Sequence, residues 1–238
     1  SFSEEGVQEV SNGSFSQEGS ELVTNGDFAT DLSGWSNTNS YWQWSSQGAY
    51  HPLGSVNNGL NQYFTNQSNK LTFSVEIISG ALVVEFGGNH TFTESGVYTI
   101  YGTTNFVNFK RSGSLECYID NVSVREVGQD WVLDANWSIA EDKAVSDGSV
   151  NGFIRTSTNL FENGKTYKVG ITVSDMTTGK VTYPYDGAGG TFITTNGDFS
   201  QTYYADDTNR CWIYGSNGFD GSITNISVKE VGQNWTLG

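Results

Sequence analysis

The strongest constraint on the fold is a phrase that occurs twice in the chain, as "YIDNVSVREVGQDW" at 118–131 and as "SITNISVKEVGQNW" at 222–235. The tryptophans that end the two copies, Trp131 and Trp235, lie about 100 residues apart, which is a domain length and far exceeds the period of a solenoid repeat. Each copy therefore predicts the last strand of its own module.

Apolar and polar residues alternate within each copy, as they do in a half-buried strand. The apolar positions are Ile119, Val122 and Val124 in the first copy and Ile223, Ile226 and Val228 in the second. The alternation slips by one residue at Asn121 and at Asn225. A slip of this kind predicts a bulge or a strand end at both asparagines.

The rest of the chain also favours β structure. Gly, Ser, Thr, Asn and aromatic residues dominate, and short alternating runs such as "KLTFSVEI" and "YKVGITVSD" end at Gly, Asn or Asp turn signals. No stretch has the periodicity of an amphipathic helix. Many short strands within two domain lengths predict an all-β chain of two tandem modules, each a sandwich or barrel with its own core.

The phrase also sets the expected boundaries. We predict an extension or linker over 1–20, module one over 21–128, module two over 129–232, and a tail over 233–238 that resembles the start of a further module. "VLDANWSIAEDKAV" is expected to open module two, with Trp137 in the place that Trp35 takes in module one. Two explanations of the tail stay open: a longer natural array, or donation of a terminal strand, from the tail or from Ser1–Ser20, to a neighbouring subunit.

Charge excludes some partners. The net charge is −15 with only 11 lysines and arginines, so the clustered cations that nucleic acid or an anionic membrane would need are missing. No apolar run approaches the ~18 residues of a membrane span, and the chain does not begin with a signal-peptide pattern, so no membrane insertion is expected. Acidic, lysine-poor surfaces suit a protein that must resist self-association.

Catalysis finds little support in the sequence. No serine elbow, HExxH, P-loop or dinucleotide fingerprint occurs, and the two histidines, His51 and His90, stand in unrelated contexts. The two cysteines, Cys117 and Cys211, take different positions relative to the repeated phrase, which predicts free or buried thiols. The chain is therefore expected not to be an enzyme and to require no cofactor.

"ELVTNGDFATDLSGW" at 21–35 together with "YIDNVSVREV" at 118–127 resembles the opening and closing signatures of jelly-roll carbohydrate-binding modules, the galactose-binding-like group. Such modules recur in polysaccharide-degrading enzymes and in phage tail and fibre proteins. The tandem form is most similar to the repeated modules of virion fibres. The resemblance implies two tandem jelly-roll β-sandwich modules, and it leaves the ligand open.

Members of that group often hold a structural calcium ion between the first strand and the closing strand. Carried over to this chain, the resemblance implies Asp120 as the matching carboxylate of module one, with oxygens near Asn25 and Asp27 as companions. Ala29 stands where the group usually has an acidic residue, and Thr224 stands at the Asp120 position of module two. The alternative is that Asp120 caps a turn.

A sugar ring stacks its apolar face on Trp or Tyr while its hydroxyls bond to polar side chains, so clustered aromatics are the candidates for binding. In module one they lie in "SYWQWSSQGAYHP". Period two separates Trp42 and Trp44, expected in the core, from the open-face candidates. The predicted sugar-binding residues of module one are Tyr41, Gln43 and Tyr50, with His51 beside them.

In module two the aromatics cluster later, in "VTYPYDGAGG" and "TYYADDTNRCWIY". The predicted sugar-binding residues there are Tyr183, Tyr185, Asp186, Arg210 and Trp212, with Tyr203 and Asp206 as possible companions. Packing of these aromatics into a small β core is the alternative.

Three functions remain open. The first, which we favour, is a non-enzymatic fibre or decoration component of a virion or cell surface, binding glycans or other surface proteins as part of a larger homo- or hetero-oligomeric assembly. The second is a pair of accessory carbohydrate-binding modules of a polysaccharide-degrading enzyme. The third is a subunit of an extracellular filament joined by exchanged terminal strands. All three place the chain on a virion surface or outside a cell.

Overall fold

The computed structural model describes residues 5–54, 59–185 and 191–232 of the 238-residue chain. The chain divides into two compact units, of which Glu18–Val127 is one, here called module one, and Gly128 onward together with Ser1–Gln17 is the other, module two. Regular structure in the described residues is β, apart from a single 3-10 turn at Thr38–Ser40. None of the described segments forms a helix long and apolar enough to cross a membrane. The all-β prediction is confirmed.

Module one is built on two very long strands, β6 (Gly59–Glu85) and β8 (Gly96–Val127), with shorter strands along their edges. The shorter strands are β2 (Glu18–Glu21), β3 (Ser36–Asn37), β4 (Gln43–Ser45), β5 (Gly48–Gly54) and β7 (Asn89–Phe92). The order is β3-β6-β8-β5-β4, with β2 paired to β8 and β7 to β6, and these pairings are antiparallel.

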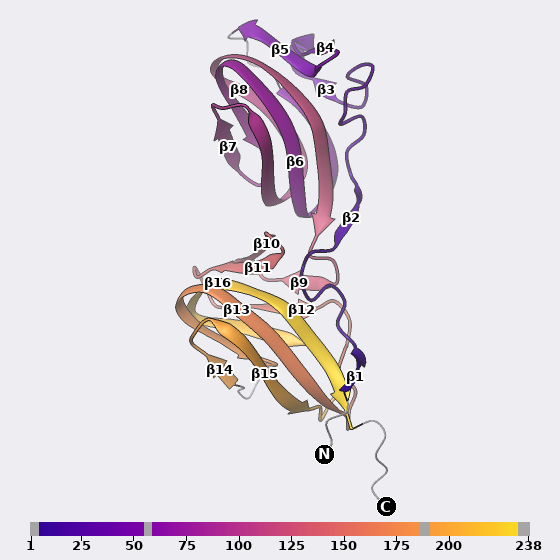
Figure 1. Cartoon of the computed structure of the whole chain (residues 1–238), viewed down its shortest axis with the longest axis vertical. Helices are drawn as coiled ribbons and strands as arrows, with labels where there is room; N and C mark the ends of the chain where they lie inside the picture. The colour runs from indigo at the N-terminus through magenta and orange to yellow at the C-terminus, as the bar shows by residue number, and fades with distance from the viewer. Residues whose placement is uncertain (1–4, 55–58, 186–190, 233–238) are drawn as a thin grey trace, which may run out of the picture. The chain divides into compact units, whose positions relative to one another are not determined.

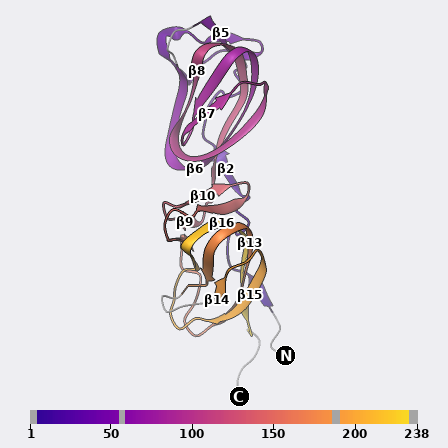
Figure 2. The same ribbon diagram turned by 90° about the vertical axis from the view of Figure 1, so that its left-hand side faces the viewer.

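The two long strands pair with each other twice. Residues 59–75 run antiparallel to 96–110, and residues 69–85 run antiparallel to 108–126. The resulting ribbon curls over on itself, as Figures 1 and 2 show for β6 and β8. An antiparallel ribbon curled into two facing layers is a jelly-roll sandwich, so this architecture is the one predicted.

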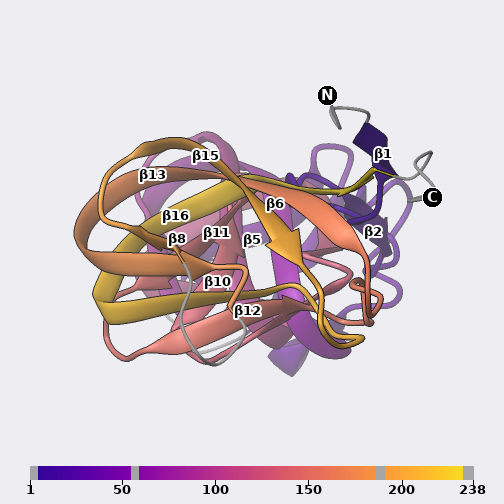
Figure 3. The same cartoon turned by 90° about the horizontal axis from the view of Figure 1, so that it is seen from below.

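Module two has the same strand order but divides the two pairings between different strands. Its strands are β1 (Glu5–Gln8), β9 (Trp131–Leu133), β10 (Trp137–Ala140), β11 (Lys143–Asp147), β12 (Gly152–Thr156), β13 (Thr166–Tyr183), β14 (Thr191–Ile193), β15 (Gly197–Tyr204) and β16 (Trp212–Val231). The long pair is β13 and β16, which contact along 167–174 with 222–230 and along 178–182 with 214–220. Figure 3 shows these two strands curling together with β15 along β13.

Each module has its own core. Side chains from both layers of module one meet inside it, with Phe73, Phe109 and Ile119 fully buried, and Val169 and Ile223 play this part in module two. Cys117 and Cys211 are free and buried, as predicted, and burial raises the pKa of both thiols to about 12. Such thiols are inert while their module is folded.

The first ten residues of the repeated phrase, 118–127 and 222–231, form the end of the last strand of each module. Val122 lies in the sheet of module one and Ile226 in the separate sheet of module two. Asn121 and Asn225 adopt left-handed backbone angles, with φ of 54° and 50°, and the register of each closing strand shifts there. The predicted bulges are confirmed, since asparagine tolerates this conformation better than most residues.

The predicted extension over 1–20 requires correction, because residues 5–17 belong to module two. Strand β1 pairs antiparallel with the end of β16, beside which it lies in Figure 1, and Val10 and Phe15 are buried. Module two is therefore discontinuous in sequence, with module one inserted between β1 and β9. The terminal segment is used inside its own chain here instead of in a neighbouring subunit, and the predicted tail at 233–238 lies outside the described residues.

A second correction concerns the tryptophan that matches Trp35. The indole N–H of Trp35 donates to the carbonyl oxygen of Asn25 at 3.0 Å, and that of Trp131 donates to the carbonyl oxygen of Asn12 at 3.1 Å. Trp131, and not Trp137, is thus the counterpart of Trp35. The sequence pattern pointed to Trp137 because Asn12, whose carbonyl oxygen accepts from Trp131, precedes all of module one in the chain.

Candidate functional site

Module two carries a group of half-buried aromatic rings on the outer face of one layer. Along β12 and the start of β16, buried residues alternate with half-buried ones, so Phe153, Trp212 and Tyr214 point away from the core. Tyr185, which follows β13, joins them because its backbone N–H donates to the carbonyl oxygen of Trp212 at 2.8 Å. We call Phe153, Tyr185, Trp212 and Tyr214 the aromatic platform.

The rings of the platform contact one another. Phe153 stacks on Tyr214, its cross-strand partner, with ring centroids 4.4 Å apart and planes inclined by 22°. Tyr185 lies 5.0 Å from Tyr214 and 5.3 Å from Phe153, and Trp212 meets Phe153 edge-on at 5.4 Å. The other rings are inclined to these two by 47–89°, so a half-buried cluster of this kind offers several separate ring faces on which a sugar can stack.

Polar groups border the platform. The guanidinium of Arg155 lies over the Trp212 ring at 4.7 Å and donates to Asp134 at 3.4 Å. Asp134 also accepts the backbone N–H of Phe153 at 2.9 Å, and the Trp212 indole donates to Asn209 at 3.2 Å. Arg155 is thus held by a carboxylate and a ring together, while its donors beside the platform can meet hydroxyl groups.

Only some of the sugar-binding residues predicted in module two belong to the aromatic platform. Tyr185 and Trp212 are brought together in it, and Arg210 is half-buried two residues before Trp212. Tyr183 is wrong as a binding residue, because its side chain is 1 % exposed and belongs to the core. Asp186 lies outside the described residues. Phe153 and Tyr214 were missed, although their alternation with buried neighbours on β12 and β16 was the signal that could have found them.

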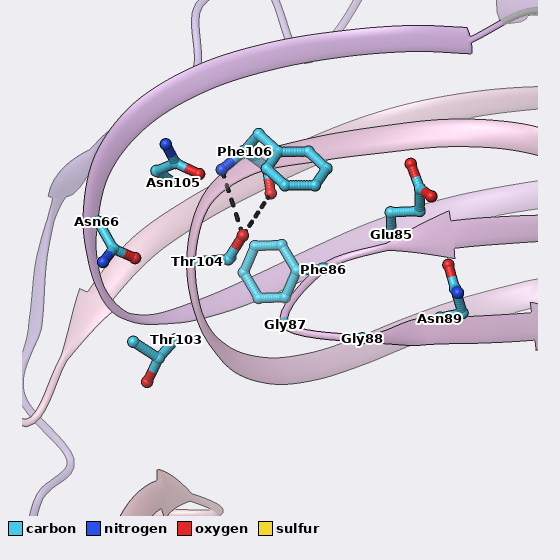
Figure 4. Close-up of a pocket in the computed structure, with 10 residues that line it drawn as sticks. All are labelled: Asn66, Glu85, Phe86, Gly87, Gly88, Asn89, Thr103, Thr104, Asn105 and Phe106. Atoms are coloured by element: carbon cyan, nitrogen blue, oxygen red, sulfur yellow. Dashed lines mark hydrogen bonds between the residues drawn. The ribbon is translucent and has the colours of Figure 1, made fainter. Parts of the chain in front are cut away.

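Module one has a pocket of about 420 Å³ where the curled ribbon of β6 and β8 turns, as Figure 4 shows. It is lined by Asn66, Glu85, Phe86, Gly87, Gly88, Asn89, Thr103, Thr104, Asn105 and Phe106. The Thr104 hydroxyl donates to the carbonyl oxygen of Phe106 at 3.1 Å and accepts its N–H at 3.3 Å, the two dashed lines of Figure 4. Buried Asn69 donates to the Thr104 carbonyl oxygen at 3.0 Å. The bend that forms the pocket is therefore fixed from inside.

The lining is polar with one aromatic wall. Partial burial acts to raise the pKa of Glu85, but hydrogen bonds from Lys110 and Asn108 outweigh it, so the pKa lies below its usual range and the group is ionised. Because Glu85 neutralises Lys110, the pocket offers no excess positive charge to an anion. Its exposed amides donate and accept hydrogen bonds, which suits a neutral, hydroxyl-rich ligand.

One wall of the pocket continues onto the surface. Phe106 pairs across the strands with Tyr63, whose side chain is 70 % exposed, and the ring centroids lie 5.8 Å apart. The sequence reasoning missed both residues. "NQYFTNQ" gave a signal in its asparagines and adjacent aromatics, but the pocket depends on the bend of the ribbon, which no short stretch shows.

The residues predicted in module one lie elsewhere. Gln43 is exposed and faces Tyr50 across β4 and β5, and Tyr50 stacks on Tyr118 at 4.7 Å. The Tyr50 hydroxyl donates to Glu116 at 2.7 Å, which raises its pKa to about 12. Tyr41 is half-buried, with its ring against His51 and its hydroxyl donating to the carbonyl oxygen of Leu53 at 3.4 Å.

Two expectations about the faces of this stretch are wrong. His51 is fully buried, with its ring against Tyr41 and Trp42, each at 4.9 Å, so it does not lie on the open face. Trp44, expected in the core beside Trp42, is 46 % exposed, because β4 is a short edge strand and the Trp44 indole reaches to donate to the carbonyl oxygen of Phe28 at 2.7 Å.

The side chains predicted to bind calcium do not form a recognisable set of metal ligands. Ca²⁺ takes six to eight oxygen ligands, yet the described residues include no group of three His, Cys, Asp or Glu side chains able to hold a metal. Asp120 accepts the backbone N–H of Asn121 at 2.8 Å, which is the turn-capping alternative, and Asp27 is exposed. Structural calcium in module one stays a prediction.

No family model matches the chain, and no curated protein matches it. Among solved structures it is similar to the tandem CBM22-1–CBM22-2 domains of Paenibacillus barcinonensis Xyn10C, with 10 % identity, a TM-score of 0.34, and 93 % of this chain and 92 % of that chain covered. It is also similar to allantoicase from Saccharomyces cerevisiae, with 10 % identity, a TM-score of 0.29, and coverage of 88 % and 92 %. A third likeness is to the triple jelly-roll turret protein of an archaeal virus, with 14 % identity, a TM-score of 0.25, and coverage of 77 % and 54 %. Likenesses this distant carry no conclusion about ligand or activity, and the jelly-roll architecture rests on the strand pairing itself.

Proposed function

We propose that the chain is a non-enzymatic glycan-binding component displayed on a virion or another extracellular surface. In this proposal the aromatic platform of module two is the main sugar-binding surface, and the pocket of module one is a second site for a neutral sugar. The modules act as rigid carriers that hold the two sites.

The observation that carries the proposal is the platform. Four rings lie within 4.4–5.4 Å of their neighbours, remain half-buried instead of entering the core, and are bordered by Arg155 and Asp134. Cross-strand ring pairs add only modestly to the stability of a sheet, so an accessible apolar cluster with convergent polar groups favours a ligand.

The two sites suit different parts of a glycan. The platform is an open surface, which favours stacking of rings along a chain, while the pocket encloses about 420 Å³ and favours a terminal or branching sugar. The acidic composition supports display on a crowded exterior and opposes binding to phosphate-rich partners.

A glycan array tests the proposal with wild type beside Trp212→Ala and Tyr185→Ala. Each substitution removes one ring of the platform, and loss of a single stacking contact is expected to weaken binding about 10-fold. Tyr204→Ala is the matched control, since Tyr204 is 61 % exposed on β15 and lies outside the platform.

Binding that is unchanged in both platform variants, or equally reduced in Tyr204→Ala, would contradict the assignment of the platform. Absence of binding by wild type to every glycan on the array would leave only the carrier role. Electron microscopy of the native assembly would test the proposed display on a virion or extracellular surface.

A further inference from the structure

Each module begins with a short segment, and the two segments are similar in sequence. "EGVQEVSNGSFSQ" at 5–17 is followed directly by "EGSELVTNGDFAT" at 18–30, so each residue of the second segment follows its counterpart by thirteen. We call these the opening segments. The first belongs to module two and the second to module one.

The opening segments make the same backbone contacts with the closing strand of their own module. In module one, Val122 N–H donates to the Gly26 carbonyl oxygen at 2.8 Å and Leu22 N–H donates to that of Val124 at 2.9 Å. In module two, the matching bonds are Ile226 to Gly13 at 2.9 Å and Glu9 to Val228 at 2.8 Å.

Two apolar side chains anchor each segment. Val10 and Phe15 in module two are buried, as are Val23 and Phe28 in module one. The Phe15 ring lies 5.2 Å from that of Trp131. Strand β1 and the turn at 11–15 are thus held by main-chain bonds and two anchored side chains, and main-chain bonds together with side-chain pockets are the means by which proteins bind peptides along a sheet edge.

The two modules differ in how the opening segment is tethered. In module one, the segment runs directly into the body that it completes, with Trp35 only five residues beyond Thr30. In module two, all of module one intervenes between Gln17 and Gly128. Because Glu18 pairs with Val127, the connection from Gln17 to Gly128 runs through folded module one, and cleavage after Gln17 would leave module two holding its opening segment by contacts alone, on equal terms with a free copy.

We propose that the groove of module two along β16 and Trp131 is an exchangeable peptide-binding site, and that its ligand is the opening segment Glu5–Gln17 of this chain or the same segment of a second copy. The required pattern is Gln-x-Val-x-Asn-Gly-x-Phe. Glycine is required at position 13 because a Cβ there would collide with the carbonyl oxygen of Ile226.

One side chain distinguishes the two opening segments. The Gln8 amide accepts the Val228 N–H at 3.0 Å and donates to the Ile226 carbonyl oxygen at 3.2 Å. Its counterpart Glu21 accepts the Val124 N–H at 2.8 Å but, as a carboxylate, has no hydrogen to donate. The module-one segment placed in the module-two groove would therefore leave a carbonyl group without its partner.

The test uses the full chain with a site-specific protease sequence inserted between Gln17 and Glu18. After cleavage, the fragment is expected to co-elute with the chain in gel filtration and to exchange with a fluorescent synthetic peptide of residues 5–17, followed by anisotropy. The Phe15→Ala peptide is expected to bind about 100-fold more weakly, because a buried ring is lost. The Gly13→Val peptide is expected not to bind, and the peptide 18–30 to bind about 10-fold more weakly for want of one buried hydrogen bond.

The uncleaved insertion variant is the control, and it is expected to melt at the same temperature as wild type because the insertion lies between the two modules in sequence. Loss of the fragment on the column while Cys211 stays protected from thiol reagents would overturn the site. So would equal binding of the Gly13→Val peptide. A fragment that stays bound while the labelled peptide never enters, even in urea just below the unfolding midpoint, would overturn the exchange with a second copy.

Discussion

Module one and module two share a skeleton and differ in what they add to it. Both close with the same phrase and open with copies of the same segment, and their long strands pair in the same order. On the equivalent outer strands, module two carries the pair Arg155 and Trp212 where module one carries the pair Asn61 and Asn108. The repeated residues therefore specify the fold, while residues that are not repeated form the candidate sites.

The largest effects on the two modules are expected at the opening-segment glycines. Gly13→Val places a Cβ against the carbonyl oxygen of Ile226, and Gly26→Val does the same against Val122, so each is expected to cost its own module about 4 kcal/mol or more. Reaction of the buried thiols with a thiol reagent measures the effect, since Cys211 reports module two and Cys117 reports module one.

We expect Gly13→Val to expose Cys211 while Cys117 stays protected, and Gly26→Val to do the reverse. Exposure of both thiols by either substitution would show that the modules do not fold independently. Protection of Cys211 in Gly13→Val would show that the opening segment is dispensable for module two.

Within module two, Tyr183 and Tyr185 distinguish a core residue from a platform residue. Tyr183→Ala removes a fully buried ring and is expected to lower the free energy of unfolding of module two by about 3–5 kcal/mol. Tyr185→Ala removes a half-buried ring of the platform and is expected to change stability by less than about 1.5 kcal/mol while weakening glycan binding. Urea unfolding of both variants measures the difference, and equal losses of stability would place Tyr185 in the core.

The sequence predicted those parts of the fold that depend on local pattern. The last strands, the bulges at Asn121 and Asn225, and the buried thiols follow from alternation and composition, and the structure confirms them. The duplication of the opening segments was also readable, because Asn12 and Asn25 begin the similar words "NGSF" and "NGDF". The sequence did not show which module each opening segment completes, because that depends on long-range strand pairing.

The candidate sites were less accessible to sequence reasoning. Alternation separates two faces of a strand but does not say which face is covered, and the face of Trp44 was assigned wrongly for this reason. Tyr183 and Tyr185 lie two residues apart, yet the strand ends between them, so only one reaches the surface. The pocket at Phe106 arises where two strands of the ribbon bend together, and its lining comes from three separated stretches of the sequence.

A substitution that fills the pocket of module one separates its binding from that of the platform. Gly88 lies in the wall, and the nearest atom to a Cβ added there is Nε2 of His90 at 3.8 Å, so a side chain fits without backbone collision. Gly88→Phe is expected to weaken binding of any glycan held in the pocket about 10-fold or more, with module two unaffected. Ser114→Phe, which adds the same ring at an exposed position outside the pocket, is the control, and isothermal titration with glycans found on the array is the measurement.

The smallest expected effect is electrostatic and distinguishes the acid stability of the two modules. Hydrogen bonds from Lys143, Ser222 and Ser174 lower the pKa of Asp175 in module two from 3.8 to about 2. Folding therefore favours the ionised carboxylate, and its contribution is complete above about pH 4 and is lost as the pH falls through 2. Asp175→Asn should lower the urea midpoint of module two at pH 7 and should approach wild type near pH 2, as followed by NMR signals of each module. Asp206→Asn, which replaces an exposed aspartate outside the cluster, is the control. If Asp175→Asn differs from wild type by the same amount at pH 7 and at pH 2, the contribution of Asp175 is not ionic.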